Sequence, residues 1–469
     1  MKIKHILLLL LTILISNITF AQTNYSCKEA LEKLIKLIEK DYPGFNEKTK
    51  DKIAYEYFKK SLIEKSKSTT DKDCLLLLKE YTSFFRDSHI FFIDASNSLK
   101  ALKVDKKEVV KNIRVSLNKI LVSKDTLEGI WKNEDFKIGM VKEKNNSYKG
   151  FIISSNDKYW QPNDVLFTLD NKKNLKYFNN DLTFFDDTYA LIDQTTLRFT
   201  KLRSYFIKDN SDGFSSDIIR DKINKLEGFY VEKLTKKTTL IKLKSFDYPF
   251  VEKIEKLITD NKKLIENTEN LIIDLRDNGG GTTTAYSPLL PYIMTGKARS
   301  LNIEFLVTDF LISGIENYLK KLPNNEKNKQ KIQELNKNVA FYKQNMGKFV
   351  LNPDEKRVEE YSFDAIERSP KQVIFLTNKK VGSSAEALLL LAKQSKKVKV
   401  MGTPTFGVLD YASARITNYD CGGNTLVLPT YRSLRLPDYP IDNIGVQPDI
   451  YLDDSVENWV KYAIQYLEN

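Results

Sequence analysis

The sequence predicts an α/β protein that carries two further regions, one helical and one β-rich. From about residue 225, short apolar segments alternate between the spacing of strands and that of helices, which is typical of an α/β core. Residues 26–83 carry apolar side chains at helical spacing, whereas residues 120–206 carry them at every second position. These patterns divide a chain of 469 residues into three structural regions after a short leader.

The leader, residues 1–21, has the composition of a secretory signal peptide. Two lysines precede an apolar run that ends at Ile15, and Thr19 and Ala21 form a small-residue cleavage site. A run of about ten apolar residues is too short to span a bilayer, which disfavours a membrane anchor. A lipid-modified Cys27 is also disfavoured because it lies far beyond that run. We therefore expect an exported protein, periplasmic or extracellular, without stable membrane insertion after cleavage.

The region 22–105 is expected to be helical and to end in a Ser-His element. Apolar residues recur at positions i, i+3, i+4 and i+7 of its first helix: Leu31, Leu34, Ile35 and Ile38. An oxidising compartment would permit one disulfide. Cys27 and Cys74 are the favoured pair because both belong to this helical region.

The region 110–210 is expected to form a small antiparallel barrel or sandwich. Apolar residues alternate in 136–140 and in 165–169, and the turn-forming segment 161–164 precedes the second run. Trp131 and the pair Tyr159–Trp160 are expected in its core, with a ligand pocket as the alternative.

The region 225–469 is expected to be the α/β core, interrupted at about 300–365 by a polar helical insertion. The predicted strands are Thr239–Leu243, Leu271–Leu275, Val373–Thr377 and Val398–Met401. The predicted helices are Phe250–Thr259 and Ser384–Lys393.

Composition excludes several classes of function. The formal net charge is +12, and falls to +10 without Lys2 and Lys4, but the remaining lysines are scattered among acids and amides. Such scatter is typical of a solvated surface and disfavours nucleic acid as a partner. The chain has three cysteines and two histidines, and cleavage removes His5. We therefore expect no metal site and no cofactor, and His89 becomes the only histidine available for catalysis.

Two glycine- or serine-rich turns follow predicted strands. In the first, Gly279–Gly281 end an apolar strand, and their N–H groups can approach a phosphate or a developing oxyanion. The threonines that follow do not fit a phosphate-binding loop, so an oxyanion hole is preferred to that alternative, and a simple tight turn is the other alternative. In the second, Ser383 and Ser384 open an apolar helix, where a serine serves either as an N-cap or as a nucleophile beside free N–H groups.

The third motif is Arg86–Ile90, which contains Ser88 and His89. A lone histidine with apolar neighbours is compatible with a purely structural role. Imidazole is, however, the side chain best suited to take a proton from a serine near neutral pH.

Together these motifs resemble the tail-specific, or C-terminal processing, serine proteases, in the branch that includes the tricorn protease core. The resemblance covers about 230–455 and the short Ser-His element. It includes the segment 274–281, the serine three residues before Glu386, the segment 400–407 and the closing 445–449. It implies a crotonase/Clp-like ββα core. Many members carry a PDZ domain between the helical start and the catalytic core. In this chain, residues 110–225 contain no recognisable carboxylate-binding loop of that domain.

One departure from the family pattern changes the expected mechanism. Tail-specific members place a lysine base just after the Thr-Phe-Gly element, where this chain has Val408. Tricorn-like members instead pair a histidine, preceded by a serine, with a carboxylate before the closing motif. The resemblance then implies Ser383 as nucleophile, His89 as base, Asp442 as orienting acid and Ser88 as a supporting hydroxyl.

The remaining site residues are assigned around this triad. Gly280, or alternatively Gly279, and Ser384 are expected to supply the oxyanion-hole N–H groups. Asp410 is the alternative acid, because it follows the place of the missing lysine.

The expected function is an exported serine peptidase that cleaves peptides or unfolded protein tails through an acyl-enzyme. The alternative is a catalytically inactive protein that binds peptides or other ligands on the same fold. The sequence sets no oligomeric state.

Overall fold

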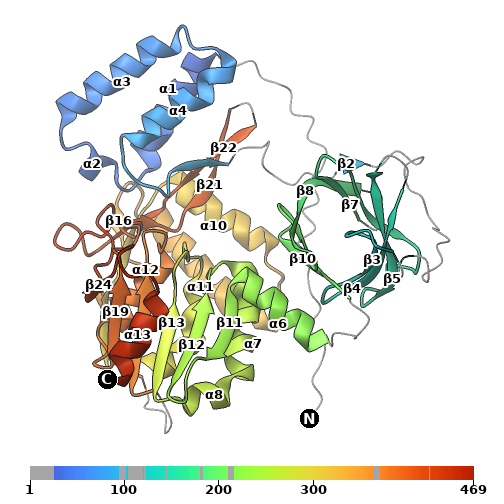
Figure 1. Cartoon of the computed structure of the whole chain (residues 1–469). Coiled ribbons are helices and arrows are strands. Elements are labelled where there is room, and N and C mark those ends of the chain that lie inside the picture. The colour runs from blue at the N-terminus through green and yellow to red at the C-terminus, as the bar shows by residue number, and fades with distance from the viewer. Residues whose placement is uncertain are drawn as a thin grey trace.

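The computed structural model describes residues 26–93, 102–103, 120, 123–143, 146–179, 183–209, 216–363, 370–421 and 423–469. The predicted signal peptide lies outside these residues. Figure 1 shows three parts: the helices of residues 27–83 at the top, a β-barrel at one side, and a larger α/β part that holds the C-terminus. No helix in these ranges has the length and apolarity needed to cross a membrane.

A six-stranded sheet forms the centre of the α/β part. Its order is β11 (Phe229–Lys233), β12 (Thr238–Leu243), β13 (Asn270–Asp274), β18 (Gln372–Thr377), β19 (Val398–Gly402) and β24 (Ile450–Tyr451). Only β11 runs antiparallel to its neighbour; the other neighbouring strands are parallel. The four predicted strands are confirmed as β12, β13, β18 and β19, with bounds that differ by at most one residue.

Helices cover both faces of this sheet. One face packs against α7 (Val251–Asp260), α9 (Leu290–Ile293), α12 (Ser384–Ala392) and the 3-10 helix Thr283–Leu289. The other face packs against α13 (Trp459–Glu468). Along β13, Leu271 and Ile273 face the first layer and Ile272 the second, so the strand reads as a continuous apolar run. The short helix α8 (Lys262–Glu266) leads into this strand.

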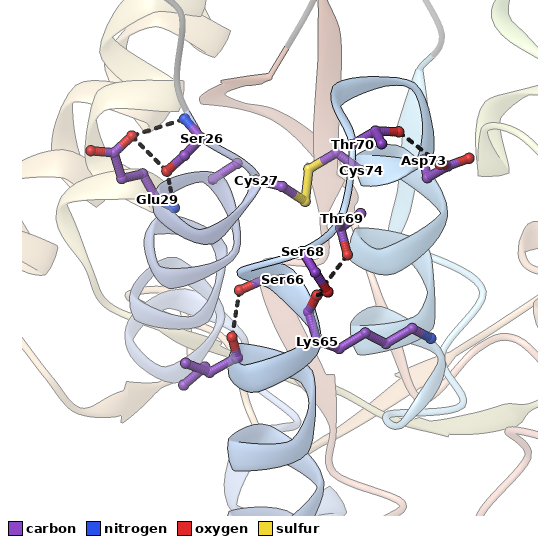
Figure 2. Close-up of a disulfide and its surroundings, with 12 residues drawn as sticks. Ser26, Cys27, Glu29, Lys65, Ser66, Ser68, Thr69, Thr70, Asp73 and Cys74 are labelled. Atoms are coloured by element: carbon purple, nitrogen blue, oxygen red, sulfur yellow. Dashed lines mark hydrogen bonds between the residues drawn. A yellow bond between two sulfur atoms is a disulfide. The ribbon is translucent and has the colours of Figure 1, made fainter.

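The N-terminal helices form a layer whose core also contains Tyr411, Tyr419, Leu426 and Leu428 from the C-terminal half of the chain. They are α1 (Cys27–Asp41), α2 (Phe45–Lys48), α3 (Lys52–Ser66) and α4 (Asp71–Ser83). The helical prediction is confirmed, and the apolar face of α1 is buried. Figure 2 shows the disulfide between Cys27 and Cys74, which joins the start of α1 to α4, as expected from the sequence. Ser26 and Glu29 form a capping box at the first turn of α1 (Figure 2).

The β-rich region closes into an antiparallel barrel. Its eight strands pair in chain order: β3 (Gly129–Lys132), β4 (Phe136–Lys142), β5 (Tyr148–Ser155), β6 (Val165–Leu169), β7 (Asn174–Phe178), β8 (Thr183–Asp193), β9 (Thr196–Phe199) and β10 (Ser204–Lys208). Pairing of β10 with β3 completes the barrel, and β2 (Leu102–Lys103) adds to the edge of β8. Trp131 is fully buried and Trp160 packs at the margin of the core, whereas Tyr159 is exposed, so the core assignment of Tyr159 was wrong. Helix α6 (Ser216–Glu227) connects the barrel to β11.

The insertion near 300–365 is only partly helical. It contains α10 (Asp309–Lys321) and α11 (Glu326–Lys343), but also β15 (Ile303–Leu306), β16 (Phe349–Val350) and β17 (Val358–Tyr361). These short strands pair with distant segments: β17 with β14 (Ala298–Leu301), and β15 with β23 (Tyr431–Ser433), which also pairs with β20 (Tyr411–Ala412). The helices of the predicted insertion are present as α10 and α11, and its short strands were not predicted because strands of two to four residues carry no readable alternation.

A small three-stranded sheet joins the N-terminal helices to the α/β part. Its order is β1 (Phe91–Ile93), β22 (Asn424–Leu428) and β21 (Arg415–Cys421). In Figure 1, β21 and β22 rise from the α/β part toward the helical layer. Because β1 directly follows the Ser-His element, this pairing carries His89 to the C-terminal half of the chain.

Candidate active site

Ser383 lies on a sharp turn between β18 and α12. It is the N-cap residue of α12 and has φ 53° and ψ −122°, a backbone conformation that non-glycine residues rarely adopt. Its N–H donates to Glu386 Oε2 at 2.9 Å. Such strain persists only where the surrounding contacts hold it, and it is concentrated at functional sites. The capping position and a nucleophilic role are therefore compatible for this serine.

The Glu386 carboxylate holds this turn against the segment that follows β19. Glu386 is fully buried. Its Oε2 also accepts the N–H of Val408 at 3.0 Å, while Oε1 accepts the N–H of Gly407 at 2.7 Å and the hydroxyl of Thr405. From the sequence, Glu386 served only to mark the spacing of the serine motif. Its position three residues after an N-cap serine was the available signal for the bond back to Ser383.

His89 reaches the same site from the N-terminal part of the chain. Ser88, His89, Gly279, Ser383 and Val408 all line one cavity of about 1980 Å³, here called the active-site cleft. Ser88 is exposed and His89 is half-buried. The cleft therefore brings the predicted nucleophile and the predicted base together.

Asp87, which sequence reasoning did not single out, fixes the backbone of the Ser-His element. Its Oδ1 accepts the N–H of His89 at 2.8 Å, and its Oδ2 accepts the hydroxyl of Tyr42 at 2.8 Å. The same Oδ1 lies 4.0 Å from His89 Nδ1. An aspartate two residues before the histidine of the Ser-His element was the available signal for this role.

Asp442 and Asp410 hold each other through reciprocal backbone bonds. Asp442 Oδ1 accepts the N–H groups of Leu409 and Asp410 at 2.8 and 2.7 Å. Asp410 Oδ2 accepts the N–H groups of Ile441 and Asp442, each at 2.8 Å. The second oxygen of Asp410 lies 3.1 Å from the guanidinium of Arg435, whereas Asp442 Oδ2 is buried and has no hydrogen-bond partner among the described residues. Asp410 Oδ1 also lacks a hydrogen bond, so the two acids differ in that Asp410 has an ion-pair partner among the described residues and Asp442 has none.

The structure leaves the His89 ring and Asp442 close but unbonded. His89 Nδ1, like Asp442 Oδ2, is buried without a hydrogen-bond partner in the described part of the chain. Their charges interact, since Asp442 raises the pKa of His89. Within the described residues, however, no ion pair of 4.0 Å or less joins the two, and no hydrogen bond joins His89 to Ser383.

Burial dominates the titration of this cluster. It lowers the pKa of His89, an effect opposed by Asp442, by the carbonyl of Tyr411 and by Glu386. Burial also raises the pKa of Asp442 to about 7, with a further increase from the negative charge of Asp87. The pKa of Asp87 itself rises to about 6 because this carboxyl is buried. Low dielectric disfavours every charged form here, so the imidazole is held neutral.

The three predicted oxyanion donors differ in whether their N–H groups are already hydrogen-bonded. The N–H of Gly280 donates to Asn278 Oδ1 at 2.9 Å and is therefore occupied. The N–H groups of Gly279 and Ser384 have no hydrogen-bond partner among the residues that the structure describes. Gly280 instead serves packing: it lies against Ser383 and Ser384 with φ +95°.

We expect Gly280→Ala to destabilise the protein by about 1–3 kcal/mol, whereas Gly279→Ala changes stability by less than about 0.5 kcal/mol. A Cβ at Gly280 would lie 2.6 Å from the carbonyl of Gly382 and 2.8 Å from Ser383 Cβ, while a Cβ at Gly279 meets nothing within 4 Å. Urea unfolding of the two variants measures the difference. Equal midpoints would contradict the packing role of Gly280.

Within the described ranges, no group of three or more His, Cys, Asp or Glu side chains is arranged to hold a metal ion.

Comparison with known proteins assigns the α/β part. Residues 237–452 match the model of peptidase family S41. No curated protein matches the chain. Among solved structures, mature CPAF is 12% identical with a TM-score of 0.46, and the match covers 94% of this chain and 96% of CPAF. A peptidase from Parabacteroides merdae is 11% identical with a TM-score of 0.41, covering 95% of this chain and 97% of that one.

The tricorn protease is 11% identical with a TM-score of 0.40, and the match covers 95% of this chain and 37% of that protein. The family model, which spans β12 to β24 and includes Ser383 and Asp442, confirms the resemblance to the C-terminal processing proteases. Residues 237–452, just under half of the chain, are therefore the part that resembles peptidase family S41.

Proposed function

We propose that the protein is an exported serine peptidase that hydrolyses peptides or unfolded protein tails through an acyl-enzyme on Ser383. One observation carries the proposal: Ser383 and His89, from opposite parts of the chain, line the same cleft. The strained turn at Ser383 supports it, because the turn exposes the side chain at the start of a helix. On this proposal the parallel sheet with α7 and α12 is a crotonase/Clp-like core.

In this mechanism His89 removes the proton of Ser383 and later returns it to the leaving amine. Its lowered pKa supports the role, because the neutral imidazole is the form that accepts a proton. Asp442 is the orienting acid: its Oδ2 and the Nδ1 of His89 are both buried without a hydrogen-bond partner among the described residues, and an acceptor and a donor of this kind are complementary. Ser88 supports the base from the exposed rim of the cleft.

The developing oxyanion would be bound by the N–H groups of Gly279 and Ser384. Both are free, and the N-terminus of α12 adds a favourable dipole. Val408, whose N–H bonds Glu386, stands where a lysine base would be, which favours the tricorn-like branch of the family.

We expect Asp442→Asn to lower kcat by up to about 10⁴-fold while the protein stays folded. That figure is the loss of kcat in a Ser-His-Asp protease whose aspartate is replaced by asparagine. Because folding raises the pKa of Asp442 to about 7, its carboxyl contributes stability below pH 3.8 that is lost as the pH rises through 7. A neutral asparagine avoids that loss and keeps an oxygen for the N–H groups of Leu409 and Asp410.

Asp410→Asn is the matched control for that substitution. It leaves the buried guanidinium of Arg435 without its ion-pair partner, so we expect a loss of about 3–5 kcal/mol of stability. Thermal melts and single-turnover kinetics separate the two effects. If Asp410→Asn abolishes turnover of the folded protein while Asp442→Asn does not, Asp410 is the orienting acid and Asp442 is not.

A serine-reactive fluorophosphonate probe tests the function directly. We expect it to label the wild-type protein and to leave Ser383→Ala unlabelled. If the wild-type protein takes no label, the catalytically inactive binding protein becomes the better proposal. The buried, unpartnered Asp442 Oδ2 argues against that alternative, because a buried carboxylate oxygen without a partner is costly unless a function retains it.

A further inference from the structure

The active-site cleft extends well beyond Ser383, toward α10 and the start of β21. Its lining includes Gly314 and Tyr318 of α10, Tyr248, and Arg415 of β21. Six basic side chains and three acidic ones line the cleft. Of the acids, Asp309 is already paired with Lys40 at 2.8 Å. The cleft therefore carries an excess of positive charge that a substrate could neutralise.

Arg415 differs from the other basic side chains of the cleft. It is half-buried, whereas Lys321, Lys331 and Lys379 are exposed. Its guanidinium packs on Gly314, since a Cβ there would lie 3.0 Å from Nη1 and 3.4 Å from Cδ of Arg415. Burial lowers the pKa of Arg415, an effect opposed by the phenols of Tyr342 and Tyr248 and not by a carboxylate.

No hydrogen bond or ion pair engages this guanidinium within the described residues. A half-buried arginine without a carboxylate is unusual, because desolvation is normally offset by a partner. The arginine fork suits a carboxylate, which it binds through two parallel N–H groups.

We propose that Arg415 binds a carboxylate of the substrate and thereby sets the specificity of the cleft. The inference rests on the proposed peptidase function. Two sources supply this chemistry: the C-terminal carboxylate of the substrate, or an acidic side chain near the scissile bond. Gly314 is the complementary residue, because a Cβ there would lie 3.0 Å from Nη1 and the guanidinium would have to shift by a few tenths of an ångström.

Two matched pairs of labelled peptides without other charges test the proposal and separate the sources. The two peptides of the first pair differ only at the C-terminus, which is a carboxylate in one and an amide in the other. The two peptides of the second pair both end in an amide and differ in one side chain, which is Glu in one and Gln in the other. That residue is placed at each position in turn. We expect one pair to show a kcat/KM ratio of about 10–100 in favour of the carboxylate. In Arg415→Met that ratio should fall to about one, and in Arg415→Lys it should be intermediate, since lysine keeps the charge without the fork.

Lys379→Met removes an exposed cation from the same cleft and is the matched control, expected to keep the ratio. The proposal is overturned if neither pair shows a preference, if Arg415→Met keeps the ratio, or if Lys379→Met lowers it equally. If the wild-type protein cleaves no peptide, the proposed peptidase function fails by itself. Fluorescence anisotropy then measures the ratio of the Kd values of the two peptides in each pair. A preference for the carboxylate peptide that is lost in Arg415→Met supports the proposal, and any other result overturns it.

Discussion

Ser383→Ala is expected to lower kcat/KM for an unstructured peptide by about three to six orders of magnitude. On the proposed mechanism, the substitution removes the hydroxyl that forms the acyl-enzyme. It leaves the cleft and the N–H groups of Gly279 and Ser384 in place, so the residual rate reflects binding and oxyanion stabilisation alone. Peptide cleavage followed by mass spectrometry under single-turnover conditions measures the loss.

Stability distinguishes loss of chemistry from loss of fold in this variant. Alanine meets the same backbone strain at φ 53° as serine does, and the bond from its N–H to Glu386 is unchanged. We therefore expect Ser383→Ala to unfold at the same urea concentration as the wild-type protein. A variant that is inactive because it is unfolded would not test the assignment.

Ser384→Ala is the matched control for the nucleophile. The Ser384 hydroxyl is buried and has no hydrogen-bond partner in the described part of the chain, and the substitution keeps the N–H that the oxyanion hole needs. Turnover within a few-fold of wild type is expected. If Ser384→Ala is inactive and Ser383→Ala is active, the neighbouring serine is the nucleophile instead.

The sequence was sufficient to predict four residues that line the cleft, Ser88, His89, Gly279 and Ser383, but not the bonds that hold them. These residues were predicted because a family resemblance links short motifs, and motifs are local. The bonds of Glu386 to the segment 405–408, and the reciprocal bonds between Asp410 and Asp442, join positions 19 to 33 residues apart. No local pattern encodes such pairings, since they depend on how the strands meet in space.

The fold shows the same division between local and distant information. The alternation in 136–140 predicted a strand, and that strand is β4. Closure of the barrel, in contrast, depends on the pairing of Ile207 with Lys132, and the alternation of single strands does not specify it. The strands of the insertion were missed for a related reason: β17 is stabilised by β14, and such short strands carry too few residues to show a period.

The choice of Gly279 over Gly280 needed atomic structure. Both glycines stand in the same triplet, and the sequence treats them alike. Only the bond from the Gly280 N–H to Asn278, and the contact of Gly280 with the Ser383 turn, separate a packing residue from a candidate donor.

His89→Ala is expected to lower kcat by about 10⁴–10⁶-fold, because the serine hydroxyl loses its base. The wild-type rate should rise with pH as His89 and Asp442 lose their protons. The pKa of His89 lies below its ordinary value of 6.5 and that of Asp442 near 7, so this rise is complete in mildly alkaline solution. The two groups interact, so the profile reports the pair rather than either residue alone.

Added imidazole provides the sharpest test of this role. Removal of the His89 ring enlarges a cleft that is open to solvent, so free imidazole can occupy the vacated place and act as the base. We expect millimolar imidazole to restore part of the activity of His89→Ala, in proportion to its neutral form, and to have no effect on Ser383→Ala. Full activity of His89→Ala without imidazole, or a wild-type rate that rises only above about pH 9, would instead indicate a lysine base, because lysine titrates near 10.4.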